Sequence, residues 1–142
     1  MKKLILFLFI SSLLIGCSDD DTKEENVLIG KWKLTHTNSF GGNFYKLSSN
    51  ENVVYDFKVN QNLSIESNIA KDSGFDKLPE DFVTPKTIPY SFHYDGKLFN
   101  DNVVKIGNET NSSFGEYYFK IQNDSLSLHE YDGRSLFFEK IQ

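Results

Sequence analysis

From residue 27 onward, apolar and polar side chains alternate with a period of two rather than 3.6. The apolar positions are rich in β-branched and aromatic residues and fall in short runs separated by Asn, Asp and Gly, which is typical of half-buried strands joined by turns. In the first run, Leu28, Trp32 and Leu34 alternate with lysine and threonine. Because successive side chains of a strand point to opposite faces, Trp32 is expected to point inward.

The next runs predict two hairpins. The first covers residues 53–69 and turns at residues 60–62, where the sequence Asn-Gln-Asn favours a turn. The second covers residues 88–106 and turns at Asp95-Gly96, a dipeptide that accepts positive φ angles. A bulge is expected near residues 100–102 of its return strand.

The last third of the chain predicts a three-stranded meander over residues 117–141, with turns at Asn123-Asp124 and Asp132-Gly133. One opening strand, two hairpins and this meander make eight antiparallel strands. Eight is the number that closes a small barrel able to hold one small ligand. The predicted fold class is therefore all-β, a small antiparallel up-and-down barrel of about eight strands.

Two connections are long, at residues 38–50 and residues 71–86. The second contains Phe82 and is expected to hold a short helical turn. Long loops in compact domains often carry function, and plain surface insertions are equally common, so both interpretations of these loops stay open.

The N-terminus has the pattern of a secretory signal. Lys2-Lys3 precedes an uncharged apolar run, which small residues follow up to position 16. The run is shorter than the roughly 20 apolar residues that a membrane-spanning helix needs. We therefore expect residues 1–16 to be a cleaved signal peptide.

The motif Leu14-Ile15-Gly16-Cys17 resembles the bacterial lipobox. That resemblance implies a diacylglyceryl group on the Cys17 thiol, cleavage before Cys17 and further acylation of the new amine. Two or more acyl chains give stable membrane anchoring. Cys17 is also the only cysteine, so the folded part can contain no disulfide.

Residues 17–26 are expected to form a flexible tether, and residues 27–142 a single domain. The stretch Ser18-Asp19-Asp20-Asp21 resembles the acidic export tract behind the lipid cysteine of some surface lipoproteins of Gram-negative bacteria. A solvated linker is the alternative reading of these acids. The expected location is the cell envelope, on an outer-membrane lipid anchor, with display at the surface or toward the periplasm left open.

Composition narrows the possible partners. Residues 1–16 carry two lysines and no acid, so their removal takes the formal charge from -5 to -7 (-5 - 2). This acidic balance makes nucleic acid an improbable partner. The 13 Phe, 7 Tyr and single Trp supply enough large apolar side chains for one core. A monomer without a cofactor is expected.

The segment Gly30-Lys31-Trp32 resembles the opening strand of lipocalin-like domains, in which a Trp plugs one end of the barrel. Residues 117–140 resemble the closing strands of the same group. In lipocalins a late basic residue packs over that Trp. The resemblance therefore implies a stack of Arg134, the only arginine, on Trp32.

The leading functional hypothesis is a non-enzymatic binding protein that holds a small apolar or amphipathic ligand. The expected inward residues that would line its site are Tyr55, Phe57, Tyr90, Phe92, Tyr117 and Phe119. The alternatives are a solid-core interaction module for protein or glycan and, least favoured, a hydrolase. His36, His93 and His129 could suggest a metal site, but His93 and His129 lie on the strand faces opposite the apolar residues, and nothing in the pattern brings the three together. No nucleophile-elbow or phosphate-binding glycine motif occurs.

Overall fold

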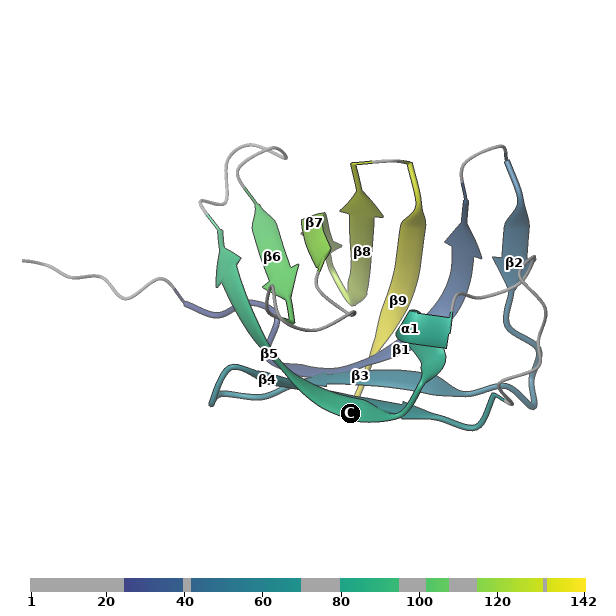
Figure 1. Ribbon diagram of the computed structural model, residues 1–142, viewed down its shortest axis with the longest axis horizontal. Helices are drawn as coiled ribbons and strands as arrows, with labels where there is room; N and C mark the ends of the chain where they lie inside the picture. The colour runs from purple at the N-terminus through teal and green to yellow at the C-terminus, as the bar shows by residue number, and fades with distance from the viewer. Residues whose placement is uncertain (1–24, 40–41, 70–79, 95–101, 108–114, 132) are drawn as a thin grey trace, which may run out of the picture.

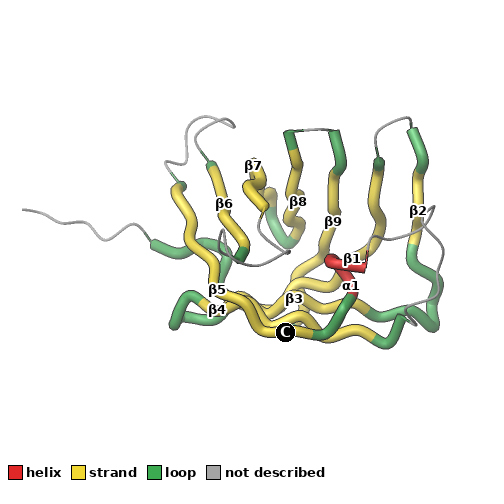
Figure 2. The backbone as a smooth tube through the Cα atoms, in the orientation of Figure 1, coloured by secondary structure: helices red, strands yellow, loops and turns green. Residues whose placement is uncertain are grey.

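The computed structural model describes residues 25–39, 42–69, 80–94, 102–107, 115–131 and 133–142. The described residues form one β-sheet and one short helix (Figures 1 and 2). They are β1 (Gly30–Asn38), β2 (Phe44–Lys46), β3 (Val53–Phe57), β4 (Asn62–Ser67), α1 (Glu80–Val83), β5 (Lys86–His93), β6 (Val103–Ile106), β7 (Gly115–Gln122), β8 (Ser125–Glu130) and β9 (Ser135–Ile141).

The sheet closes on itself. From β3 to β9, each strand pairs antiparallel with the next, and β1 pairs with β3 on one side and with β9 on the other. These eight strands form the predicted antiparallel up-and-down barrel, lipocalin-like in its strand order. The ninth strand, β2, pairs with the last residues of β1 and was not predicted. All pairings of the described residues lie within residues 30–141.

Strands on opposite sides of the barrel cross, as tilted barrel strands must. Figure 1 shows β3 and β4 running across the foot of the molecule, whereas β6, β8 and β9 stand upright. Strand β5 bends between the two sets. It pairs with β4 up to Pro89 and with β6 from Tyr90 onward, so the residue without an N–H lies where the partner changes.

The described turns confirm those predicted. Gln61 and Asn123 adopt positive φ angles of 58° and 54° in the β3–β4 and β7–β8 turns, and Gly133 has a φ of 97° between β8 and β9. The helical turn expected near Phe82 is α1. The predicted turn at Asp95-Gly96 and most of the bulge predicted near residues 100–102 lie outside the described residues.

Strand β1 contains a bulge that the alternation did not predict. Its register with β9 shifts between Leu34 and His36. Because the bulge adds one residue, the phase of the side chains reverses beyond it, and Thr37 becomes a buried inward residue. Thr35 then lies at the irregularity, and its hydroxyl donates a 2.9 Å hydrogen bond to the Phe137 carbonyl.

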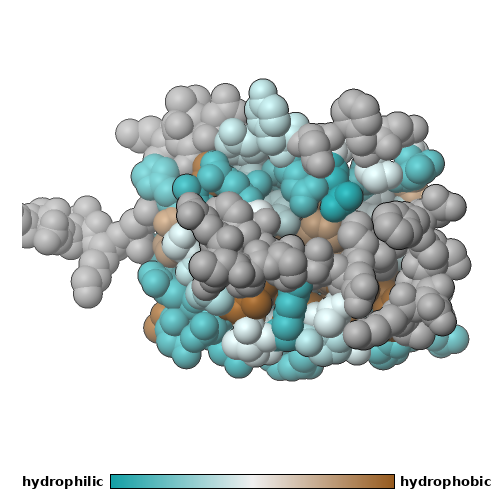
Figure 3. All heavy atoms as spheres, viewed as in Figure 1, coloured by the Kyte–Doolittle hydropathy of each residue, from teal (hydrophilic) through white to brown (hydrophobic). Residues whose placement is uncertain are grey.

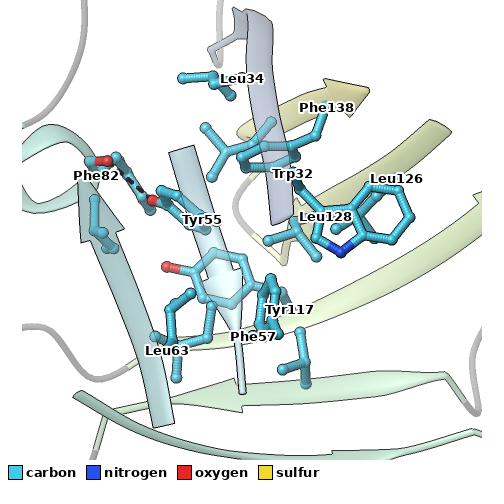
Figure 4. Close-up of a cluster of buried hydrophobic side chains, with 14 of the residues drawn as sticks. Trp32, Leu34, Tyr55, Phe57, Leu63, Phe82, Tyr117, Leu126, Leu128 and Phe138 are labelled. Atoms are coloured by element: carbon cyan, nitrogen blue, oxygen red, sulfur yellow. Dashed lines mark hydrogen bonds between the residues drawn. The ribbon is translucent and has the colours of Figure 1, made fainter. Parts of the chain in front are cut away.

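Each end of the barrel is covered by a segment outside the strands. At the end where β1 begins, Leu28 is fully buried and its carbonyl accepts a 2.8 Å hydrogen bond from Trp32 Nε1. At the opposite end of the barrel lies helix α1, which comes between β4 and β5 in the chain (Figure 1). Its Phe82 and Val83 are buried. The core between these covers is a continuous cluster of aromatic and aliphatic side chains (Figure 4).

Candidate ligand site in the barrel interior

Five of the six predicted inward aromatics are core residues. The exposed fraction of their side chains is at most 5%; they are Tyr55, Phe57, Tyr90, Tyr117 and Phe119. The sixth, Phe92, is half-buried and packs against the same core. The structure therefore confirms the inward orientation derived from the alternation.

Ring contacts join these side chains across the barrel. Tyr55 and Phe138 lie with ring centroids 4.9 Å apart, and Phe57 meets Tyr90 edge-on at 5.0 Å. Figure 4 shows Tyr55 pointing toward Phe82, whose ring meets Tyr117 at 6.2 Å. Such tilted and edge-on pairs are the favoured arrangements of packed aromatic rings.

The buried tyrosine hydroxyls are held by distant backbone groups. The Tyr55 hydroxyl donates to the Phe82 carbonyl at 3.0 Å and thereby ties β3 to α1. The Tyr90 hydroxyl donates to the Lys58 carbonyl at 2.9 Å and accepts from Asn26 Nδ2 at 2.6 Å. Burial raises the pKa of Tyr90, so its hydroxyl keeps its proton.

One buried side-chain polar atom of the described residues is left without a hydrogen-bond partner. The side chain of Asn102 is 8% exposed, and its Oδ1 accepts no hydrogen bond. The backbone of Asn102 is fixed, because its carbonyl accepts a 2.9 Å hydrogen bond from the Phe119 N–H. Buried polar atoms without partners are few in folded proteins, and each needs an explanation.

The strand register places Asn102 between two aromatic residues. Val103 pairs with His93 and with Tyr118, so one position earlier Asn102 lies opposite Tyr94 and Phe119. The rings of Tyr94 and Phe119 are stacked at 5.9 Å with an interplanar angle of 26°.

Two other inward apolar side chains lie on the strands next to Asn102, Phe92 on β5 and Ile121 on β7. Both are half-buried, as Tyr94 is. We refer to these residues as the Asn102 cluster: Phe92, Tyr94, Asn102, Phe119 and Ile121. The cluster joins partly accessible apolar surface to one unpaired acceptor.

The predicted stack of Arg134 on Trp32 is wrong. Lys140 occupies that place, with Nζ 5.3 Å from the Trp32 ring, because the β1–β9 register sets Lys140 directly opposite Trp32. Arg134 lies in the turn at the other end of β9. There its guanidinium lies 5.2 Å from the ring of Phe82 and 3.5 Å from the Glu130 carboxylate.

Sequence reasoning missed the buried Asn102 and the contact of the exposed Lys140 with Trp32, although a signal was present. Asn102 has the same phase as the inward Val104 and Ile106, and Lys140 has the same phase as the inward Leu136 and Phe138. A polar residue at an inward position of a strand is the pattern that would have identified both.

The histidines lie on the outer surface. His129 contacts the hydroxyls of Ser135 and Ser127 at 2.8 Å and 3.0 Å, and its ring meets Phe137 edge-on. His36 stacks on the other side of Phe137 at 4.3 Å. Within the described part of the chain, no three His, Cys, Asp or Glu side chains form a group that could hold a metal ion.

The closed sheet and its core define the class of this protein as a small antiparallel β-barrel. Comparisons of the chain with protein-family models, with curated proteins and with solved structures give no match. Among the described residues, no helix has the length and apolar character needed to span a membrane.

Proposed function

We propose that the protein is a lipid-anchored, non-enzymatic lipoprotein of the cell envelope whose barrel binds a small apolar or amphipathic ligand. The observation that carries the proposal is the Asn102 cluster. Inward residues elsewhere in the described barrel are mostly below 10% exposure, yet Phe92, Tyr94 and Ile121 stay partly accessible. Apolar side chains that face a barrel interior and remain accessible are the usual lining of a ligand site.

The energetics favour an apolar ligand body. Burial of apolar surface contributes roughly 25 cal/mol per Å². A ligand that covers Phe92, Tyr94 and Ile121 removes their apolar surface from water together with its own. The five fully packed aromatics would then act as a rigid floor beneath these three side chains.

The anchor half of the proposal rests on the lipobox motif. Acylated Cys17 would hold the protein at the membrane, with residues 18–26 as the tether. Nine extended residues span at most about 30 Å. The barrel would therefore stay close to the lipid surface, where amphipathic molecules are concentrated.

Binding of the neutral fluorophore N-phenyl-1-naphthylamine to residues 22–142 tests the ligand site. This segment contains every described pairing and the whole described core. We expect saturable fluorescence enhancement that Phe92→Asp abolishes. The matched control is Phe44→Asp, because Phe44 is 60% exposed on the short outer strand β2. Equal binding by both variants, or none by the wild type, would contradict the proposal.

A second candidate function is favoured by an outer aromatic patch, which consists of His36, Phe44, His129 and Phe137. Phe44 and Phe137 lie 5.2 Å and 4.3 Å from the His36 ring, on the outside of β2, β1 and β9. On the face shown in Figure 3 the described residues are mostly hydrophilic, with small separate apolar areas. Such a patch would suit an interaction module for protein or glycan.

Site-specific photocrosslinking in the cell envelope tests this alternative. A photoreactive residue at Phe44 should capture a partner. The same residue at Val59, which is 78% exposed in the β3–β4 turn, serves as the control. Equal capture at both positions would argue against the patch.

A further inference from the structure

We infer that Asn102 Oδ1 recognises the polar end of the ligand, so that the barrel selects neutral amphiphiles that carry a hydroxyl or N–H donor. This inference rests on the proposed ligand-binding function. It adds the chemistry of the ligand's polar group, which the apolar lining alone does not specify.

The first argument is the unsatisfied acceptor. Oδ1 of Asn102 is buried and has no hydrogen-bond partner, whereas the buried hydroxyls of Tyr55 and Tyr90 and the indole N–H of Trp32 are all paired. A buried acceptor without a donor destabilises the fold, so a donor brought by a ligand gains more than an equivalent contact on the surface.

The second argument is that Asn102 is held rigidly at its position. The Phe119 N–H binds its carbonyl, and Val103 continues directly into the β6 ladder. The backbone therefore cannot turn the amide outward to water without breaking strand pairing. A fixed acceptor of this kind is preorganised for binding.

The third argument concerns the side chains that surround the Asn102 amide. Tyr94 and Phe119 lie on either side of Asn102 in the sheet, and Phe92 and Ile121 are inward neighbours of Tyr94 and Phe119 along the strands. A ligand whose donor reaches Oδ1 would place the atoms next to that donor against these apolar side chains. This arrangement fits a molecule with one small polar head and an apolar body.

The chemistry of the acceptor sets the selectivity. A carbonyl oxygen accepts a hydrogen bond from a hydroxyl or N–H group, and it gains nothing from an ether oxygen. An alcohol and an ether with equal numbers of heavy atoms bury similar apolar surface. Any difference in affinity between them therefore reports on the hydrogen bond to Oδ1.

The test compares 1-decanol with its isomer nonyl methyl ether, measured by displacement of N-phenyl-1-naphthylamine from residues 22–142. The wild type should bind the alcohol about fivefold to tenfold more tightly, as expected for one hydrogen bond of ordinary net strength. Asn102→Leu should remove this preference and leave ether binding unchanged or stronger. Asn60→Leu, in the exposed β3–β4 turn, is the matched control and should keep the preference.

A second variant, Asn102→Asp, tests the assignment independently in case Asn102→Leu does not fold. Asn102→Asp keeps an acceptor of the same shape and adds a negative charge, so it should bind decylammonium more tightly than the wild type does. Equal affinities of the wild type for alcohol and ether, or an alcohol preference that survives in Asn102→Leu, overturn the assignment of Asn102 alone. Failure of every probe to bind the wild type overturns the proposed function as well.

Discussion

At the scale of single residues, hydrogen bonds and close packing hold the interior of the barrel together across long sequence separations. Asn26 and Tyr90 are joined by a side-chain hydrogen bond although 64 positions separate them. Trp32 is buried, bonded through Nε1 to Leu28, and covered by Lys140. The cation–π contact on Trp32 contributes about 0.5 to 2 kcal/mol, less than the burial of the indole itself.

The side chain of Tyr117 occupies the space that a side chain at position 115 would need, so this position is a glycine. A Cβ atom on Gly115 would lie 2.5 Å from the Tyr117 hydroxyl oxygen and 2.7 Å from its ring. We expect Gly115→Ala to lower the free energy of unfolding by about 1 to 3 kcal/mol, the usual effect of overpacking. In chemical denaturation, the double variant Gly115→Ala with Tyr117→Leu should lose less than the sum of the single variants. Strict additivity would show that the two residues do not interact.

His129 should make stability depend on pH. Burial lowers the pKa of His129 from its ordinary value of 6.5, so the unfolded chain takes up a proton at a higher pH than the folded protein does. This contribution to stability is present above pH 6.5 and is lost as the pH falls through the lowered pKa of the folded state. Thermal unfolding of the wild type and of His129→Gln between pH 5 and 8 measures it.

The variant His129→Gln should show a smaller loss of stability on acidification than the wild type. His36 supplies a remaining share, because burial and the nearby Lys46 lower its pKa as well, against an opposing effect of Glu139. Identical pH profiles of the wild type and the variant would show that His129 has the same pKa in the folded and unfolded states.

At the scale of elements, alternation and turn residues predicted the eight barrel strands and their order. These signals are local: inward residues recur every second position, and Asn or Gly marks the turns. The β1 bulge and the contact of Lys140 with Trp32 were missed, because each depends on the pairing of β1 with the distant strand β9. Strand β2 was missed although its pairing with β1 is local, because it has only three residues and lies in a connection that was predicted as a loop. The β1–β9 register in particular joins the two ends of the domain, and no local pattern reports it.

The candidate site was predicted less completely than the fold. The alternation located all six inward aromatics, but it could not distinguish packed rings such as Phe57 from accessible ones such as Phe92. That difference depends on which side chains of other strands pack against each residue. It becomes visible only when all strands are in register.

Helix α1 is fixed to the barrel by the hydrogen bond between the Tyr55 hydroxyl and the Phe82 carbonyl. We expect Tyr55→Phe to lower the free energy of unfolding by about 1 kcal/mol, since the buried carbonyl loses its donor. Tyr131→Phe is the matched control, because Tyr131 is 91% exposed. Equal denaturation midpoints of both variants and the wild type would show that this bond adds nothing to stability.

At the scale of the whole molecule, closure of the sheet removes the open edges of the eight barrel strands and leaves β2 as a short extra strand. The proposed lipid tether would place this closed barrel where it meets amphipathic molecules at a membrane surface. The packed rings would then serve stability, and the partly accessible Phe92, Tyr94 and Ile121 would serve binding.

Lipid anchoring is tested by Cys17→Ser. The wild type should incorporate labelled palmitate and sediment with membranes, since acyl chains contribute roughly 0.8 kcal/mol per buried methylene. The variant should lack the label and remain in the soluble fraction after export. Sedimentation of an unlabelled variant with the membranes would show that another part of the chain holds the protein there.

The most direct test of ligand binding is native mass spectrometry of residues 22–142 after incubation with a lipid extract of the cell envelope. We predict a one-to-one adduct that organic extraction removes, that Phe92→Asp loses and that Phe44→Asp retains. No adduct on the wild type, or an adduct that Phe92→Asp retains in full, would contradict a ligand site in this barrel.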